Sequence, residues 1–275
     1  MTTTEAPTGI EAIAEAFARA RANGRRAALM PYLMGGYPDL ETSRAIGVAY
    51  AEGGADLIEL GVPFSDPLAD GPVIHAAGTV ALRRGATLPA VLEVARDIAD
   101  RVPVVLMCYA NPILTHGLER FLDMLVAARV SGLIVPDLPL EEATELRPAC
   151  RARGLAFVPL VAPTTPAERL ERIGAGASGF LYTVSVTGTT GERSEIAGGL
   201  AAIVARVATH TKVPVAVGFG ISTPEQAAAA AAAGADGVII GTRLVRAAGE
   251  ASDPAAAVRD LVAGFSAALS ETPLG

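Results

Sequence analysis

The chain has 275 residues, of which 51% are hydrophobic, 4% are aromatic and none is tryptophan. This composition suits one large domain with a core of alanine, valine, leucine and isoleucine. The formal net charge of −7 disfavours a nucleic-acid groove or an anionic membrane surface as the main partner.

The ends of the chain and its thiol and imidazole groups suggest no further module. Residues 1–9 are polar and rich in threonine, so we expect a disordered tail ahead of one domain over 10–275. No signal peptide opens the chain and no apolar run reaches about 18 residues, so we expect a cytoplasmic protein without a membrane partner. Cys108, Cys150 and the three histidines have no metal-ligand spacing, which predicts no metal site.

Short apolar runs alternate with helical segments along the whole domain. Strands are predicted at 28–34, 57–60, 102–107, 132–135, 156–161, 179–183, 213–217 and 237–240. Helices are predicted at 10–23, 40–51, 73–84, 88–100, 117–129, 140–153, 166–173, 196–209, 223–233 and 254–269. Such short apolar strands are typical of a parallel sheet covered by helices. Their number favours a (β/α)8 TIM barrel, with an extra N-terminal helix, over an open doubly wound sheet.

The second predicted strand contains a glutamate, Glu59, and runs into an unusually long loop. Strand-to-helix loops usually take about 2–6 residues, yet no helix can begin before Pro72, and two earlier prolines stiffen the path. Asp66 and Asp70 project from this loop. The pattern favours a catalytic rim, and the alternative is an acidic, solvated surface loop.

Glycine-rich loops follow the last two predicted strands. Gly218, Gly220 and Gly241 allow close approach of the backbone to an anion, and Thr242 adds a hydroxyl. Loops at this place in a barrel often bind phosphate; alternatively, the glycines merely turn the chain. Arg243 could assist, although an exposed arginine at a helix start is the other interpretation.

The segment at 184–195 is also too long for an ordinary connection and is rich in glycine, threonine and serine. It predicts a lid between the phosphate loops and the carboxylates, and the alternative is a plain mobile loop.

The carboxyl ends of parallel strands meet at one end of a barrel, so these loops should form one surface. The sequence therefore predicts a small substrate whose phosphate is held by amides, with Glu59 near its other end. A glutamate in an apolar barrel mouth loses hydration, which raises its pKa and suits acid–base catalysis near neutral pH. Lys212, the only lysine, precedes a strand, which disfavours Schiff-base chemistry.

The run from Glu59 to Pro72 resembles the signature of the tryptophan synthase α subunit family, and 107–111, 186–191 and 218–222 extend the resemblance over nearly the whole chain after the tail. The resemblance implies a (β/α)8 barrel that cleaves indole-3-glycerol phosphate to indole and glyceraldehyde 3-phosphate without a cofactor in this chain. It implies that Glu59 moves protons between the 3′-hydroxyl and indole C3. Asp70 would bind the indole N–H and stabilise the protonated ring, and Tyr182 would line the site.

Further residues take roles only through this resemblance. Thr190 would hold Asp70 when the lid closes. Phosphate would be bound by Gly191, Gly220, Gly241 and Thr242. The indole pocket would be lined by Tyr32, Met107, Ile134, Phe219 and Ile239. Met34 and Phe180 depart from the family pattern, which affects only the detail of the pocket.

The resemblance also implies a partner. The family works as an α2β2 heterotetramer with a pyridoxal-phosphate β subunit that receives the indole. Asp66, Pro67, Asn111 and Pro112 would lie at that contact. For Asp66 and Pro67 the alternative is a purely local turn geometry.

Other functions remain open on the sequence. The chain could be a stand-alone indole-3-glycerol-phosphate lyase, or a related phosphosugar isomerase, although no paired acid and base on opposite strands supports an isomerase. It could also be a non-catalytic phosphate-binding barrel that activates a partner subunit, against which the intact Glu59 and Asp70 argue.

Overall fold

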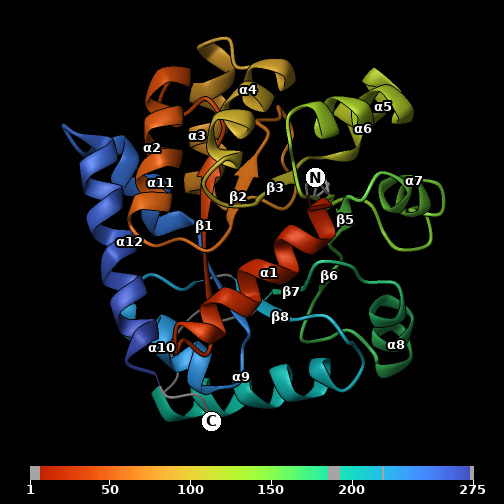
Figure 1. The fold of residues 1–275 in the computed structure, drawn as a ribbon, viewed down its shortest axis with the longest axis vertical. Coiled ribbons are helices and arrows are strands. Elements are labelled where there is room, and N and C mark those ends of the chain that lie inside the picture. The colour runs from red at the N-terminus through yellow and green to blue at the C-terminus, as the bar shows by residue number, and fades with distance from the viewer. Residues whose placement is uncertain (1–6, 185–192, 219, 273–275) are drawn as a thin grey trace, which may run out of the picture.

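The computed structural model describes residues 7–184, 193–218 and 220–272, and within them strands and helices alternate around one sheet (Figure 1). The strands are β1 Ala28–Met34, β2 Ile58–Gly61, β3 Val104–Met107, β4 Gly132–Ile134, β5 Ala156–Phe157, β6 Leu160–Val161, β7 Leu181–Val184, β8 Val215–Gly218 and β9 Gly237–Ile240. The helices are α1 Gly9–Ala22, α2 Leu40–Glu52, α3 Pro72–Arg83, α4 Leu88–Ala99, α5 Ala110–His116, α6 Leu118–Ala127, α7 Leu146–Ala152, α8 Ala167–Ala175, α9 Arg193–Ala208, α10 Pro224–Ala232, α11 Thr242–Glu250 and α12 Pro254–Ser270.

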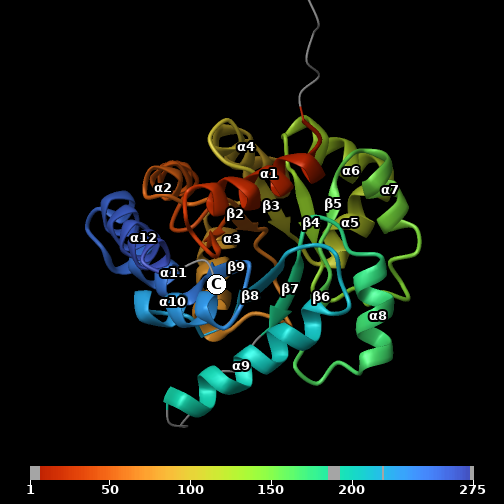
Figure 2. The same cartoon turned by 60° about the horizontal axis from the view of Figure 1, so that its bottom comes forward.

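The sheet closes into a barrel through an interrupted strand. Its order is β5-β4-β3-β2-β1-β9-β8-β7-β6, so β5 and β6 occupy its two edges. Only Val158 and Pro159 separate these edges in the chain. The Val158 N–H donates to Leu133 O of β4 at 2.9 Å, while Pro159 O accepts from the Tyr182 N–H of β7 at 3.0 Å. The predicted (β/α)8 barrel is therefore confirmed, and Figure 2, with the bottom of Figure 1 turned forward, shows the strands arranged as a ring.

Several predicted elements were wrong in detail. The single strand expected over 156–161 is β5 and β6, because Pro159 has no N–H to donate to a neighbouring strand. The helix expected over 140–153 is only α7, preceded by turns. Helices α5 and α11 were not predicted. In α5, Pro112 lies in the first turn, where a missing N–H costs no helical hydrogen bond.

Alternating side chains divide the core into two layers. Leu29 and Leu33 of β1 face outward into the cluster beneath the helices, whereas Met30 faces the barrel interior. Helix α1 closes the amino-terminal end of the barrel: Phe17 packs in the interior cluster, with its ring centroid 6.0 Å from that of Phe180. Phe180 is thus a residue of the barrel floor.

The start of α1 takes in part of the expected tail. Thr8 caps the helix, accepting from the Glu11 N–H while the Glu11 carboxylate accepts from the Thr8 N–H. This reciprocal cap fixes the entry of the chain into α1. Across the part of the chain that the structure describes, none of the helices has the length and apolar character needed to span a membrane.

Candidate active site

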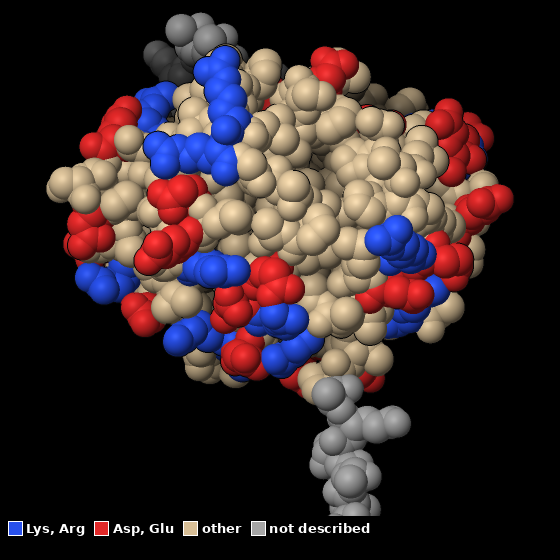
Figure 3. Space-filling model, turned by 90° about the horizontal axis from the view of Figure 1, so that it is seen from above, with Lys and Arg blue, Asp and Glu red and all other residues tan. Residues whose placement is uncertain are grey.

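A cavity of about 410 Å³ opens at the carboxyl-terminal ends of the strands. Nine of the residues predicted for the site line it: Glu59, Asp70, Tyr182, Tyr32, Met107, Ile239, Gly220, Gly241 and Thr242. Figure 3 looks onto the end of the molecule that is uppermost in Figure 1, where a largely uncharged area surrounds a hollow. The barrel thus brings residues from six strands, or from the loops that follow them, to one opening.

Glu59 faces the interior because of its position in β2. It pairs in register with Tyr32 of β1 and Val105 of β3. Its two neighbours in the strand, Ile58 and Leu60, face outward. Its side chain is buried, and Oε2 has no hydrogen-bond partner among the described residues. Burial, with a smaller contribution from the negative charge of Asp70, raises the pKa of Glu59 to about 8. Glu59 therefore exchanges a proton near neutral pH.

Asp70 is held by Tyr109, a residue for which the sequence predicted no role. The Tyr109 hydroxyl donates to Asp70 Oδ1 at 2.9 Å and accepts from the Ala69 N–H at 3.1 Å. Burial raises the pKa of Asp70, while the hydrogen bond from Tyr109 and the nearby His75 oppose that rise. Tyr109 lies two residues after the predicted third strand, which places it near the barrel mouth, but its contact with Asp70 spans 39 positions of the chain and no local pattern reports it.

Two glycines make room for the two tyrosine hydroxyls of the cavity. A Cβ added at Gly61 would lie 2.0 Å from the Tyr32 hydroxyl oxygen, and one at Gly218 would lie 2.3 Å from that of Tyr182. Burial raises the pKa of both phenols well above the usual value, as do nearby carboxylates. Both tyrosines therefore stay neutral and can act as hydrogen-bond donors. Met34, which departs from the family pattern, is buried in the same small apolar cluster as Tyr32.

Another part of the cavity lining comes from the turn before α10 and from the start of α11. Gly220 has a φ of +77°, a conformation that favours glycine. Helix α10 is capped by its own Thr223 and Gln226, whereas Gly241 at the start of α11 makes no side-chain cap. The first N–H groups of α11 therefore remain available to an anion.

Of the other residues predicted for substrate binding, one is described away from the cavity and three lie outside the described residues. Ile134 is buried in the interior cluster and does not line the cavity, whereas Pro136 and Leu160, which were not predicted, do. Thr190, Gly191 and Phe219, and most of the expected lid, lie outside the described residues.

The expected partner residues lie in two segments that touch. Asp66 and Asn111 are exposed, Pro67 and Pro112 are half-buried, and the bond from the Ala69 N–H to Tyr109 joins the loop after β2 to the start of α5. Phe64 of the loop also stacks on Tyr109, with ring centroids 5.2 Å apart. Two leucines of these segments are strongly exposed, Leu68 at 82% and Leu114 at 76%.

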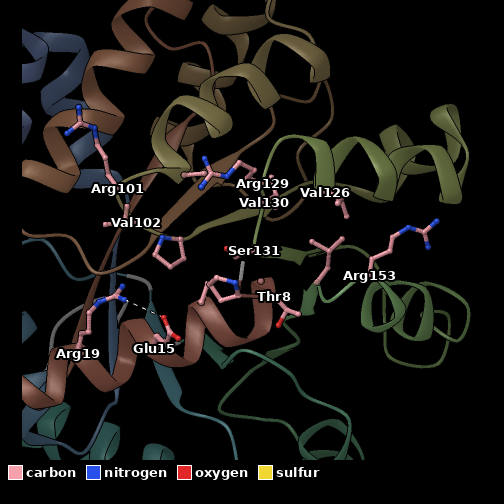
Figure 4. A pocket seen from close by; sticks show the side chains of 16 residues that line it. Thr8, Glu15, Arg19, Arg101, Val102, Val126, Arg129, Val130, Ser131 and Arg153 are labelled. Carbon is pink, nitrogen blue, oxygen red and sulfur yellow. Dashed lines mark ion pairs between the residues drawn. The ribbon is translucent and has the colours of Figure 1, made fainter. Parts of the chain in front are cut away.

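A second cavity, of about 450 Å³, lies at the other end of the barrel, between α1 and the starts of the strands (Figure 4). It contains none of the predicted site residues. Arg19 pairs with Glu15 beside it, and Arg129 and Arg153 pair with acidic residues of neighbouring segments. In Figure 4 the Arg153 side chain points away from the cavity, so the arginines around this cavity do not converge on a ligand.

Comparisons with known proteins agree with this geometry. The sequence profile of the family described as "Tryptophan synthase alpha chain" matches residues 17–270. The chain is 51% identical to the tryptophan synthase alpha chain of Prochlorococcus marinus (strain MIT 9313) over 236 residues, covering 85% of this chain and 86% of that protein. It is 48% identical to that of Methanosarcina mazei over 229 residues, covering 83% of this chain and 84% of that protein.

Solved structures show the same fold. Mycobacterium tuberculosis tryptophan synthase superposes with a TM-score of 0.85 at 39% identity, covering 96% of this chain and 98% of that chain. Tryptophan synthase subunit alpha from Legionella pneumophila str. Paris superposes with a TM-score of 0.86 at 36% identity, covering 96% of this chain and 99% of that chain. The chain therefore belongs to the tryptophan synthase alpha chain family, which comprises lyases of tryptophan biosynthesis.

Proposed function

We propose that this chain cleaves indole-3-glycerol phosphate to indole and glyceraldehyde 3-phosphate, with Glu59 as the acid–base. The observation that supports this most is the buried Glu59 carboxyl, which has a pKa of about 8 and an oxygen without a hydrogen-bond partner among the described residues. It lines a cavity whose lining also includes glycine turns. A solvated structural carboxylate would have neither feature.

The raised pKa sets the order of proton transfers. At neutral pH most Glu59 side chains are protonated, so Glu59 donates its proton to C3 of the indole ring and leaves a cationic indolenine. The resulting carboxylate accepts the proton of the 3′-hydroxyl. The electron pair of that O–H bond forms the aldehyde carbonyl, the bond between indole C3 and the glycerol carbon breaks, and its electron pair restores the aromatic ring. Glu59 ends protonated again.

Asp70 stabilises the intermediate cation. Its carboxylate accepts a hydrogen bond from the indole N–H. Protonation of C3 makes this N–H more acidic, so the hydrogen bond strengthens along the reaction. Tyr109 keeps the carboxylate of Asp70 oriented through its 2.9 Å hydrogen bond. Since protonated indole itself accepts the electrons of the cleaved bond, the proposed reaction needs no cofactor in this chain.

The phosphate lies at the start of α11. Gly220 and Gly241 allow the backbone to approach it, the uncapped N–H groups of α11 bind it, and the Thr242 hydroxyl adds a donor. Tyr32, Met107 and Ile239 provide the mainly apolar wall that an indole ring requires.

Indole formation from indole-3-glycerol phosphate by the purified chain tests the proposal. Glu59→Gln and Asp70→Asn should each reduce kcat by at least ~100-fold, because each removes a group that acts in the transition state. Glu52→Gln, an equivalent change at an exposed position of α2, is the matched control and should keep full activity. Near-normal cleavage by Glu59→Gln would rule out the proposed acid–base, and no indole from the wild-type chain would rule out the lyase.

We propose further that a pyridoxal-phosphate β subunit binds at the joined segments around Leu68 and Leu114, in an α2β2 complex located in the cytoplasm. Strongly exposed leucines on two segments that touch are typical of an interface. The two described cysteines are buried free thiols, which fits a reducing compartment such as the cytoplasm. Leu68→Ser and Leu114→Ser should weaken binding of a tryptophan synthase β subunit, measured by calorimetry, without lowering lyase activity of the isolated chain. Binding equal to that of the wild type would exclude this surface.

A further inference from the structure

Two arginines of α11, Arg243 and Arg246, line the same cavity as Glu59 and Asp70. They are three residues apart on a helix and therefore project from one face. Arg243 is half-buried and Arg246 is exposed at the mouth. Both come from α11, whose start is the proposed phosphate site.

Neither arginine has an acidic partner in the part of the chain that the structure describes. Among the described residues, no ion pair or side-chain hydrogen bond involves Arg243 or Arg246, although many other arginines of the chain pair with acidic residues. Among the described residues, the mouth therefore holds two positive charges without an ion-pair partner, in a chain with a net charge of −7.

The place of Arg243, in the first turn of α11, is unfavourable for the helix itself. The amino-terminal end of a helix has a partial positive charge, so a cation in the first turn costs about 0.3–1 kcal/mol where an acidic residue would stabilise. The first turn of α11 contains no acidic residue and has no side-chain cap. An anion bound at this end would relieve both the repulsion and the missing cap.

We propose that Arg243 and Arg246 form a cationic gate that selects ligands with a phosphate dianion and compensates the two carboxylates of the cavity. This inference rests on the proposed function for the identity of the substrate, and it adds charge recognition to a site otherwise built from backbone amides and a hydroxyl. When Glu59 and Asp70 are ionised they repel a phosphate dianion, and the two guanidinium groups cancel that repulsion at the phosphate end. Arg243, the more buried, contributes the larger share.

Direct binding to the purified full-length chain tests the gate, with glycerol 3-phosphate and inorganic phosphate as charged probes and indole as the uncharged probe. Calorimetry on Arg243→Gln should show ~10-fold weaker binding of glycerol 3-phosphate, and on Arg246→Gln ~3-fold weaker binding, as expected for a part-buried and an exposed charged contact. Indole affinity should stay within about twofold in both. Arg243→Lys should recover most of the lost affinity, since it keeps the charge.

Arg83→Gln is the matched control. Arg83 is an exposed arginine at the far end of α3 with no described ion pair, so this variant removes one positive charge outside the cavity and should bind both probes as the wild type does. Added salt should weaken glycerol 3-phosphate binding to the wild type more than to the Arg243→Gln/Arg246→Gln double variant. In turnover, the double variant should change KM more than kcat.

The outcomes separate the two proposals. A double variant that binds glycerol 3-phosphate within about twofold of the wild type would overturn the gate, whatever the reaction. Equal weakening of phosphate and indole binding would also overturn it, because that pattern indicates damage to the cavity. A wild-type chain that binds phosphate through these arginines but releases no indole would refute the lyase and leave the gate intact.

Discussion

Glu59 should make the folded chain less stable as the pH rises. The pKa of Glu59 is about 8 in the folded protein, against an ordinary value of 4.5, because burial disfavours its ionised form. Since each pKa unit corresponds to about 1.4 kcal/mol, the folded state loses roughly 5 kcal/mol relative to a chain without this carboxyl. The sign follows from proton binding: between these two pKa values the folded state binds more protons than the unfolded state, so stability falls as the pH rises.

Glu59→Gln removes the ionisation and should flatten this dependence. Below pH ~4.5 the carboxyl is neutral in both states, so the pH-dependent destabilisation is absent, and above pH ~8 it is fully developed. The buried amide of glutamine adds a pH-independent penalty of about 1–3 kcal/mol. The expected signal therefore comes from the difference in free energy of unfolding between variant and wild type. It is the change in this difference between pH 5 and pH 9. The variant should gain roughly 3–5 kcal/mol relative to the wild type over this range.

Urea unfolding at pH 5, 7 and 9 measures these free energies, with Glu52→Gln as the exposed control that should follow the wild type at every pH. The same carboxyl should govern catalysis, so the lyase rate of the wild type should decline above pH ~8 as the proton needed at indole C3 is lost. If the difference between Glu59→Gln and the wild type is the same at pH 5 and pH 9, Glu59 does not have a raised pKa and the argument from its burial fails.

Three further changes test the site and its support. Tyr109→Phe should lower kcat/KM for indole release ~10-fold and move the acidic limb of the pH profile upward, because loss of its hydrogen bond raises the pKa of Asp70; an unshifted limb would contradict this. Gly61→Ala should displace the Tyr32 hydroxyl, lowering kcat/KM and costing about 1–3 kcal/mol of stability in urea unfolding, while Gly264→Ala, where a Cβ meets nothing, should cost none. Phe17→Ala should cost about 3–5 kcal/mol in urea unfolding without changing KM, since it empties the barrel floor and not the mouth; a raised KM would show that floor and mouth are coupled.

The place of Glu59 could be predicted from the sequence because it depends only on local alternation. Its neighbours in the strand are apolar and face the helices, so a residue between them must face the interior. The glycine turns before α10 and α11 were equally local signals. In contrast, the role of Tyr109 was not predicted, because it depends on a contact with Asp70, 39 positions away in the chain, which no local pattern reports.

The sequence by itself determined a parallel α/β barrel of one domain, the inward position of Glu59 and the loops at its mouth, since strand period, apolar runs and turn residues act within a few neighbouring positions. Only the tertiary structure decided how β5 and β6 close the barrel around Pro159, which tyrosine holds Asp70, and that Gly61 and Gly218 make room for two hydroxyls. These features depend on the register between strands and on the space left by distant side chains, and both arise only when the whole barrel packs.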